Sequence, residues 1–344
     1  MSLPQSPTAE IVVHFQEKRG LPEYRFERKE QSLPEMAGEI AVVFLSGPGY
    51  DMGGNGQSFN THNGRISVRK RSFEMKPETA AVQEGTLHDE NTGGMNSPIY
   101  TSSAYDYTIR EEIPYPRYFN IPNQKAVGAK IAALEKGEAG VVFSSGMAAI
   151  SSSVMAFAGA GDHVVLLDEL YGGTHKLATQ WFSHFGIEYS FAATDADDIM
   201  EKTRKNTRVI VVESPTNPLL NVLDIGRVAR YARSMGIVTV MDNTFATPVN
   251  QNPLLWGMDI VVHSGTKYMG GHSDLCCGMV VSNREKTDRI VKLACSTGPS
   301  LDPRICYLLE RSMKTLSVRV ERQTRNAMRI AEHLDRMPSV RRVY

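Results

Sequence analysis

The chain has 344 residues, 41% of them hydrophobic, and its 38 Lys and Arg residues balance 38 Asp and Glu residues, so its formal net charge is zero. This length allows two domains with a sizeable core, and the charge balance gives no electrostatic reason to expect a nucleic acid or an anionic membrane as partner. The start lacks the basic and apolar regions of a signal peptide, and no apolar run approaches the roughly 20 residues of a membrane helix, so we expect a cytoplasmic protein.

The four cysteines indicate neither a disulfide framework nor a metal site. Two of them are adjacent, and none has the CxxC spacing of a zinc or redox site. We therefore expect reduced thiols, mostly buried, and no metal. They are Cys276, Cys277, Cys295 and Cys306.

Residues 1–74 differ in composition from the rest of the chain. They carry mixed charge, one apolar strand candidate at 39–47 ("EIAVVFLSG") and a stretch rich in Gly and Asn. This composition is typical of a small appended module or a loosely ordered arm. No chemistry can be read from it, so we treat 1–74 as an N-terminal extension of unknown role.

From about residue 138 onward, short apolar runs alternate with amphipathic stretches. Strands are predicted at 139–143, 162–169, 207–213, 237–242 and 259–264, with helices over 144–161, 171–186 and 224–236 and a long one over 304–337. Strands that are apolar throughout and separated by helices indicate an α/β fold with a mostly parallel sheet covered on both faces. Ligands on such sheets bind at the carboxyl ends of the strands.

Three features fall at those strand ends. The turn at 144–146 ("SSG") leads into a helix, where free N–H groups at Gly146 and Met147 suit a phosphate, although many such turns serve only for capping. Asp242 follows a strand, either as a turn residue or as the partner of a ring cation. Lys267 follows the next strand, where a lysine is usually just a solvated charge. Together an amine, a carboxylate and a phosphate cradle are what pyridoxal phosphate (PLP) requires.

Residues from about 75 to 344 resemble the Cys/Met-metabolism (trans-sulfuration) family of PLP enzymes. The motifs "SSGMAAI", "YGGT", "ESPTNP", "MDNTFATP" and "VHSGTKYMGGHSD" stand in the family's order and at similar spacing. The resemblance implies the PLP-dependent transferase fold of type I, which is aspartate-aminotransferase-like. It also implies a large PLP-binding domain over 123–312 and, over 313–344, a linking helix that starts a C-terminal domain.

The resemblance also implies roles for single residues. Lys267 is similar to the lysine that binds the cofactor covalently and then moves protons, and Asp242 to the partner of the pyridine nitrogen. Tyr171 is similar to the tyrosine that stacks on the cofactor ring and acts as acid or base at the leaving group. Phosphate contacts are implied for the N–H groups of Gly146 and Met147 and the hydroxyls of Ser264 and Thr266. Glu213 and Asn217 in "ESPTNP" match positions near the cofactor, and of the two Asn217 is implied as the direct contact.

The segment "YPRYFNIPNQ" belongs to an N-terminal arm over 75–122. In the family a Tyr-x-Arg pair on such an arm reaches the neighbouring subunit's phosphate site, which implies that role for Tyr115 and Arg117. The alternative is an arm lying on its own domain, with Arg117 in a surface contact. The resemblance thus implies a homo-oligomer, typically a dimer of dimers, with an active site shared between chains.

The implied activity is formation or cleavage of a C–S bond on cystathionine or an activated homoserine, as in cystathionine γ-synthase or γ-lyase. Methionine γ-lyases generally carry a cysteine two residues after the stacking tyrosine, where this chain has Gly173, so that activity ranks lower. Cystathionine β-lyase and transaminase chemistry stay open. The family extends further than "RMPSVRRVY" and supplies a carboxylate-binding arginine there, so a shortened PLP-binding member with little turnover, acting as a scaffold, is another alternative.

Overall fold

The computed structural model describes residues 10–18, 21–29, 57–62, 65–70, 75–109 and 112–344. The chain divides into two units, Met1–Gly53 and Gly54–Tyr344. The first unit contains an antiparallel hairpin of β1 (Glu10–Lys18) and β2 (Leu21–Lys29). The second contains a separate antiparallel pair, β3 (Gln57–His62) and β4 (Arg65–Lys70), and the large sheet described below. The strand predicted at 39–47 lies outside the described residues.

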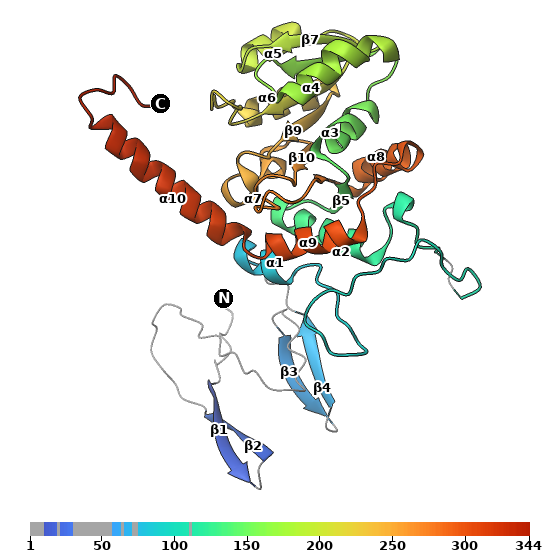
Figure 1. The fold of residues 1–344 in the computed structure, drawn as a ribbon, viewed down its shortest axis with the longest axis vertical. Coiled ribbons are helices and arrows are strands. Elements are labelled where there is room, and N and C mark those ends of the chain that lie inside the picture. Colours follow the sequence, from blue (N-terminus) through green and yellow to red (C-terminus); the bar gives the residue numbers. More distant parts are fainter. Residues whose placement is uncertain (1–9, 19–20, 30–56, 63–64, 71–74, 110–111) are drawn as a thin grey trace, which may run out of the picture. The chain divides into compact units, whose positions relative to one another are not determined.

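The second unit is built on a seven-stranded sheet with the order β5-β11-β10-β9-β8-β6-β7 (Figure 1). All its strands are parallel except β11, which runs antiparallel to both of its neighbours. The mostly parallel sheet predicted from the sequence is therefore present. Its strands are β5 (Ala139–Phe143), β6 (His163–Leu167), β7 (Glu188–Ala192), β8 (Thr207–Glu213), β9 (Val238–Asp242), β10 (Ile260–Ser264) and β11 (Gly278–Ser282).

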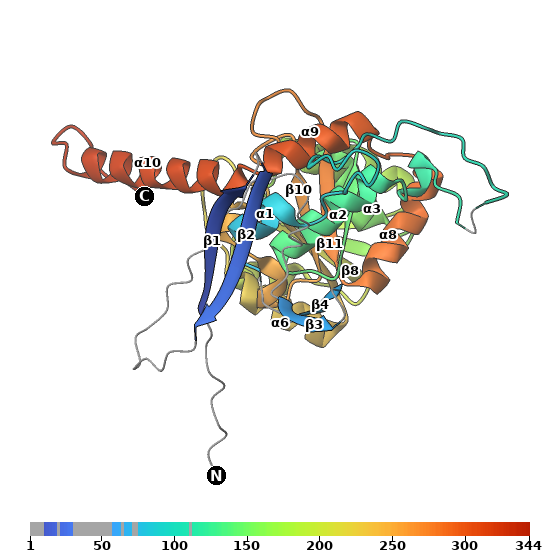
Figure 2. The ribbon, with the colours of Figure 1, turned by 90° about the horizontal axis from the view of Figure 1, so that it is seen from below.

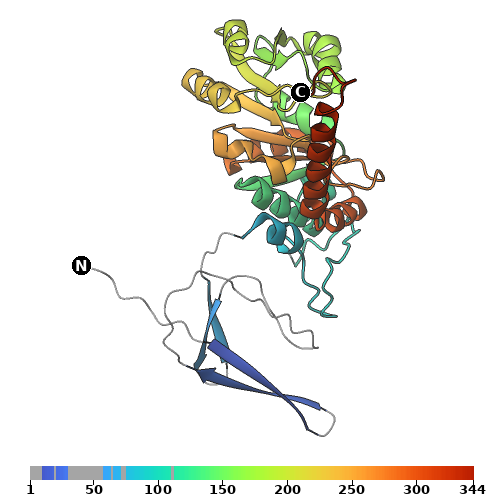
Figure 3. The ribbon, with the colours of Figure 1, turned by 90° about the vertical axis from the view of Figure 1, so that its left-hand side faces the viewer.

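Helices cover both faces of this sheet, which is seen edge-on among them in Figure 3. They are α1 (Pro77–Gln83), α2 (Pro122–Glu135), α3 (Gly146–Met155), α4 (Gly172–Lys176), α5 (Ala196–Lys202), α6 (Ile225–Met235), α7 (Thr247–Asn250), α8 (Arg284–Thr297), α9 (Pro303–Met313) and α10 (Leu316–Asp335). One π-helical turn, Leu177–Trp181, and three 3-10 turns, Pro116–Tyr118, Phe182–Phe185 and Pro253–Trp256, complete the described elements.

Two apolar cores hold these layers together, one on each side of β5 and β11. Phe143 and Val280 belong to the core that α3 and α8 complete, whereas Val142 and Val281 belong to the core completed by α1, α2 and α9. Successive side chains of a strand point to opposite faces, so an apolar run such as "VVF" serves both cores at once. Figures 1 and 2 show α1, α2 and α9 side by side below the sheet.

The sequence-based prediction of one long helix over 304–337 is wrong. The chain forms α9 and α10 instead, which are separated at Lys314 and Thr315. Leu316 and Val320 in the first turns of α10 are buried, but beyond them the helix is exposed on all sides and extends past its neighbours (Figures 1 and 2). The first turns of α10 therefore fix its position, because only they contact the core.

Candidate active site

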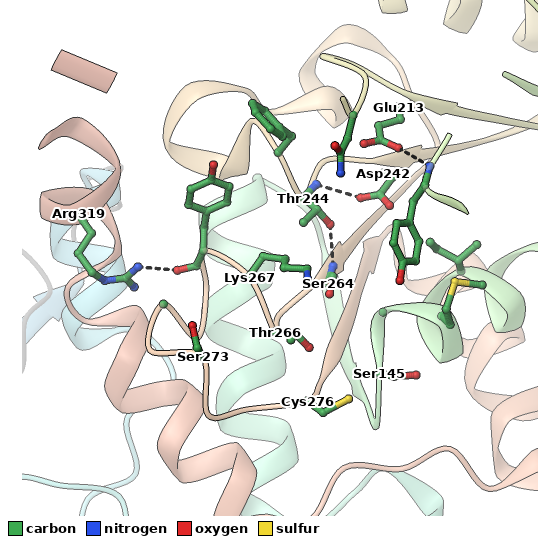
Figure 4. Close-up of a pocket in the computed structure, with 18 of the residues that line it drawn as sticks. Ser145, Glu213, Asp242, Thr244, Ser264, Thr266, Lys267, Ser273, Cys276 and Arg319 are labelled. Carbon is green, nitrogen blue, oxygen red and sulfur yellow. Dashed lines mark hydrogen bonds between the residues drawn. The ribbon is translucent and has the colours of Figure 1, made fainter. Parts of the chain in front are cut away.

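A cavity of about 800 Å³ opens where β8, β9 and β10 end and α3 begins (Figure 4). Parallel strands present their carboxyl ends at one edge of a sheet, so side chains distant in sequence meet there. Eight of the ten residues predicted as cofactor contacts line it. They are Gly146, Met147, Tyr171, Asn217, Asp242, Ser264, Thr266 and Lys267.

Lys267 lies three residues beyond β10, in a turn where its N–H donates to the Ser264 carbonyl at 3.2 Å. The side chain is exposed to the cavity, and no described residue forms a hydrogen bond or an ion pair with its amine. If the side chain pointed into solvent or made only surface contacts, Lys267 would be an ordinary solvated charge. An unpaired amine inside a cavity, next to a buried carboxylate on the adjacent strand, is instead available for covalent chemistry.

Asp242 ends β9 and is 7% exposed. Its Oδ1 accepts the Thr244 N–H at 3.0 Å, and the Thr244 hydroxyl accepts the Ser264 N–H at 2.7 Å, which joins the ends of β9 and β10. Burial raises the pKa of Asp242, and the hydrogen bonds from Thr244 and the charge of His263 oppose that rise. A cationic group placed against this carboxylate would favour its ionised form, because no described cationic side chain forms a hydrogen bond or an ion pair with it.

Glu213 ends β8 and is the register partner of Asp242. It is 4% exposed, and its Oε2 accepts the Tyr171 N–H at 3.1 Å. Burial and the neighbouring Asp242 carboxylate raise the pKa of Glu213 to about 8. At neutral pH Glu213 is therefore mostly protonated, whereas the hydrogen bonds from Thr244 and the charge of His263 favour the ionised form of Asp242.

The start of α3 supplies the cradle that a phosphate needs. The first N–H groups of a helix have no intrahelical acceptor and attract anions. A Cβ on Gly146 would lie 2.8 Å from Ser264 Cβ and 3.0 Å from Ser264 Cα, so only glycine lets the helix start against the end of β10. Helix N–H groups and the Ser264 hydroxyl thus face one place. Ser145 caps the helix by accepting the Ala148 N–H at 3.1 Å.

The Thr266 hydroxyl and the Asn217 amide, two further predicted contacts, differ in how far other groups of the chain already engage them. The Thr266 hydroxyl accepts the Cys277 N–H at 3.2 Å, so part of its hydrogen-bonding capacity is used within the chain. Asn217 is exposed at the cavity, and no described residue forms a hydrogen bond with its side-chain amide. Tyr171, half-exposed, stands beside the cavity just before α4. Its ring is free to stack on a planar ligand.

These groups fit PLP in their chemistry. The Lys267 amine suits the aldehyde of that cofactor, and the buried Asp242 carboxylate suits its ring nitrogen. The Tyr171 ring suits the face of the cofactor ring, and the anion cradle at Gly146 suits the phosphate. The glycine contact is the most specific evidence of fit, because a side chain at 146 would occupy the space between helix and strand.

Tyr115 and Arg117, the other two predicted contacts, do not line this cavity. Arg117 Nη1 donates to the Cys295 carbonyl at 2.6 Å in the same chain, and its guanidinium lies over the rings of Tyr115 and Tyr118 at 5.5 and 5.0 Å. The structure of one chain thus places the pair at the end of α8. Their predicted role in a neighbouring subunit stays a prediction.

Several lining residues were not predicted from the sequence. Thr244 and Phe245 follow Asp242 by two and three residues, so their position in "MDNTF" is a signal that could have identified them. Cys276 and Arg319 carry no such signal, because a return loop and the start of α10 bring them to the cavity. Arg319 donates to the carbonyl of Tyr268 at 2.7 Å (Figure 4), and burial lowers its pKa.

The described part of the chain shows other features that bear on function. All four cysteines are free thiols; Cys277 and Cys306 are buried, Cys295 is half-buried and Cys276 is exposed. No group of three or more His, Cys, Asp or Glu side chains there is arranged to bind a metal ion. Within the same residues, every helix is too short or too polar to span a bilayer.

Comparisons with known proteins agree with this geometry. The family model described as Cys/Met metabolism PLP-dependent enzyme matches residues 78–344. Cystathionine gamma-lyase of Bacillus subtilis is 42% identical over 275 residues, which are 78% of this chain and 72% of that protein. Cystathionine beta-lyase MetC of the same organism is 40% identical, covering 78% and 69%, and an L-methionine gamma-lyase of Fusobacterium nucleatum is 40% identical, covering 77% and 71%.

Solved structures show the same fold. The crystal structure of cystathionine gamma-lyase from Lactobacillus plantarum complexed with L-serine has a TM-score of 0.75 and 38% identity, covering 78% of this chain and 71% of that chain. The structure of metB from Corynebacterium glutamicum has a TM-score of 0.74 and 37% identity, covering 77% and 70%. The predicted fold of type I is thereby confirmed.

Proposed function

Because this chain belongs to the Cys/Met metabolism family of PLP-dependent enzymes, we propose that it cleaves the carbon–sulfur bond of cystathionine on the γ side, as a cystathionine γ-lyase does. One observation carries the proposal. The unpaired Lys267 amine stands at the end of β10, in one cavity with the buried Asp242 carboxylate at the end of β9. The relatives named as lyases favour cleavage over C–S bond formation on an activated homoserine.

When bound, PLP draws electron density from the substrate carbon that carries the amino group, so the hydrogens on that carbon and its neighbour become acidic. In the proposed mechanism Lys267 is the base that takes these protons and later returns one, since its amine is exposed to the cavity and unpaired among the described residues. Asp242 would hold the protonated ring nitrogen of the bound cofactor through its buried carboxylate.

Tyr171 is proposed to protonate the departing sulfur. Its side chain lines the cavity. Its backbone N–H donates to Glu213 Oε2 at 3.1 Å, which fixes the backbone of Tyr171 and leaves the phenol group free to contact a substrate. The N–H groups of Gly146 and Met147 and the hydroxyls of Ser264 and Thr266 bind the phosphate. Asn217, exposed at the cavity, is proposed to contact the cofactor or substrate directly.

The backbone around Gly173 supports cystathionine over methionine as substrate. A Cβ on Gly173 would lie 2.6 Å from Tyr171 Cε1 and 2.8 Å from Met147 Sδ. The cysteine that methionine γ-lyases generally carry at this place would therefore displace the tyrosine ring. A glycine here leaves the ring in position.

The product set tests the proposal. With cystathionine and water, γ-cleavage gives cysteine, 2-oxobutyrate and ammonia, whereas β-cleavage gives homocysteine, pyruvate and ammonia. The expected result is 2-oxobutyrate with equimolar cysteine. Pyruvate and homocysteine would assign the chain to the β-lyase type, and stoichiometric amino transfer to a 2-oxo acid would assign it to transamination. PLP binding without any product would support the scaffold alternative.

The anchor is tested with Lys267→Ala. Borohydride reduction of the wild-type holoenzyme should fix the cofactor on the peptide that contains Lys267, and the variant should carry no label there and lose about a thousandfold or more in turnover. Lys205→Ala, at an exposed lysine of the opposite sheet edge, is the matched control and should behave as wild type. A label on another lysine would overturn the assignment.

A further inference from the structure

A buried carboxylate lies behind the cavity and takes no direct part in it. Glu135, the last residue of α2, is fully buried. Its Oε1 accepts the Asn243 side-chain N–H at 2.7 Å and the His263 Nε2–H at 2.6 Å, and its Oε2 accepts the Asn252 amide at 3.3 Å. None of these four residues lines the cavity.

The partners of Glu135 are chain neighbours of the proposed catalytic groups. Asn243 directly follows Asp242, and His263 directly precedes Ser264 and stands four residues before Lys267. Since neighbouring residues of a strand point to opposite faces, His263 reaches Glu135 on one side of β10 while Ser264 faces the cavity on the other. One carboxylate thus holds two strand ends from behind.

The same network reaches a third strand end. The side-chain oxygen Oδ1 of Asn243 accepts the Gln251 side-chain N–H at 2.9 Å, and the Gln251 side chain also donates to the backbone carbonyl of Ser214 at 3.0 Å. Ser214 directly follows Glu213 at the end of β8. The ends of β8, β9 and β10 are therefore linked through side chains that lie behind them.

A fully buried carboxylate fixes its partners because it is costly without them. Removing the charge leaves two buried N–H groups with a weaker acceptor, and this frees Asn243 and His263 to move. The charge of His263 also lowers the pKa of Asp242. The contacts of Glu135 with Asn243 and His263 and the charge of His263 therefore all act on Asp242, the carboxylate in the cavity.

We propose that Glu135 is a positioning residue for the cofactor site: through Asn243 and His263 it fixes Asp242 and the turn of Ser264 and Lys267 relative to each other. This inference rests on the roles proposed above for Asp242 and Lys267. It assigns no contact of Glu135 with cofactor or substrate. Its effect reaches the reaction only through the strand ends that it holds.

The test is Glu135→Gln, which keeps the size and one acceptor oxygen but removes the charge. Equilibrium dialysis of the full chain should show PLP binding weakened by about tenfold, and the absorption maximum of the bound cofactor should shift, because a charge-assisted hydrogen bond is lost behind the ring-nitrogen partner. Borohydride should still label Lys267. Binding and spectrum are measured without relying on turnover.

The matched control is Thr239→Val, which loosens the same two strands at the opposite sheet edge. Thr239 is fully buried; its hydroxyl donates to Asp259 Oδ2 at 3.0 Å and accepts the Asp259 N–H at 2.8 Å. It should lower thermal stability like Glu135→Gln but leave PLP affinity and spectrum unchanged. If both variants change PLP binding equally, or neither changes it, Glu135 is only a structural residue and the proposal is overturned.

His263→Gln changes the same contact from its other side and keeps the proposal testable if Glu135→Gln folds poorly. Where both variants fold, a double-mutant cycle adds a second test. His263→Gln should weaken PLP binding in the same sense, and combining it with Glu135→Gln should cost less than the product of the two fold-changes, because both act through one contact. Fully multiplicative effects would contradict a shared path. If borohydride labels a lysine other than Lys267 in the wild-type protein, the proposed anchor itself is overturned.

Discussion

At the scale of single residues, the site is governed by two carboxyl groups on adjacent strands. Glu213 and Asp242 are register partners, and both are almost fully buried. Thr244 and His263 favour the charged form of Asp242, whereas the main neighbour of Glu213 is Asp242 itself. Glu213 is therefore a neutral acceptor for the Tyr171 N–H, and the groups that favour an ionised carboxylate lie at Asp242.

This division predicts how Glu213→Gln changes stability. The pKa of Glu213 is about 8 in the folded chain, above the ordinary 4.5. The folded state thus keeps a proton that the unfolded chain releases, and the free energy of unfolding falls as pH rises between those values. Glutamine stays neutral and removes this slope, so above pH 8 the cofactor-free variant should be more stable by roughly 3–5 kcal/mol.

Denaturant unfolding of the cofactor-free protein at several pH values measures this effect. Glu285→Gln, at an exposed carboxyl group on α8, is the control and should keep the wild-type slope. A Glu213→Gln curve parallel to that of wild type across the whole pH range would show that Glu213 is ionised in the folded chain.

The sequence identifies some of these residues and misses others for a clear reason. Asp242 ends an apolar strand, and Gly146 and Lys267 each follow one by three residues, so the rule of strand ends places all three at one edge. Glu135 looks like any polar residue at a helix end, and its contacts with Asn243 and His263 span more than a hundred positions. Such partners follow from the packing of α2 under the sheet, which no local pattern encodes.

At the scale of elements, the turn after β10 is held by the first turns of α10. Arg319 donates to the carbonyls of Tyr268 at 2.7 Å and Ser312 at 3.1 Å, and its Nε–H to the Thr315 hydroxyl at 3.1 Å. All these acceptors are neutral. One guanidinium therefore joins the turn that carries Lys267 to the junction between α9 and α10.

We expect Arg319→Ala to loosen this turn. Hydrogen exchange should become faster in residues 266–273, and PLP should bind about tenfold more weakly, because the lost contacts fixed the backbone next to Lys267. Arg325→Ala on the exposed part of the same helix is the matched control. If both variants leave exchange in 266–273 unchanged, the turn is fixed by other contacts.

Element by element, the sequence predicts the parallel strands better than the others. β5, β6, β8, β9 and β10 were expected from their apolar runs, whereas β7 and β11 were missed. β7 lies at the sheet edge with an exposed first residue, so its apolar signal is weak. β11 follows the Lys267 turn without a helix between, so it lacks the strand–helix alternation and pairs antiparallel. The long predicted helix failed at Lys314, where local periodicity continues but the chain turns.

At the scale of the whole molecule, the arm over 75–122 is used in two ways. Its helix α1 packs into the chain's own core through Ala80 and Ala81, and Lys130 of α2 donates to the Ala81 carbonyl at 3.1 Å. Its later part, with Tyr115 and Arg117, lies near the end of α8, and Arg117 is exposed. Among the described residues Arg117 forms a hydrogen bond only with a carbonyl, so this exposed cation is available for an anion on another chain.

Hybrid oligomers test whether Arg117 completes a neighbour's site. If it does, Arg117→Ala and Lys267→Ala chains are each inactive, but a mixed dimer contains one site with both residues intact. Random exchange makes half of the dimers mixed, so about a quarter of wild-type activity should return. The measurement is turnover after the two proteins are partly unfolded together and refolded.

Lys267→Ala mixed with Asp242→Ala is the control: both residues line the cavity of one chain, so no site is repaired. Recovery in both mixtures, or in neither, would rule out a site shared through Arg117.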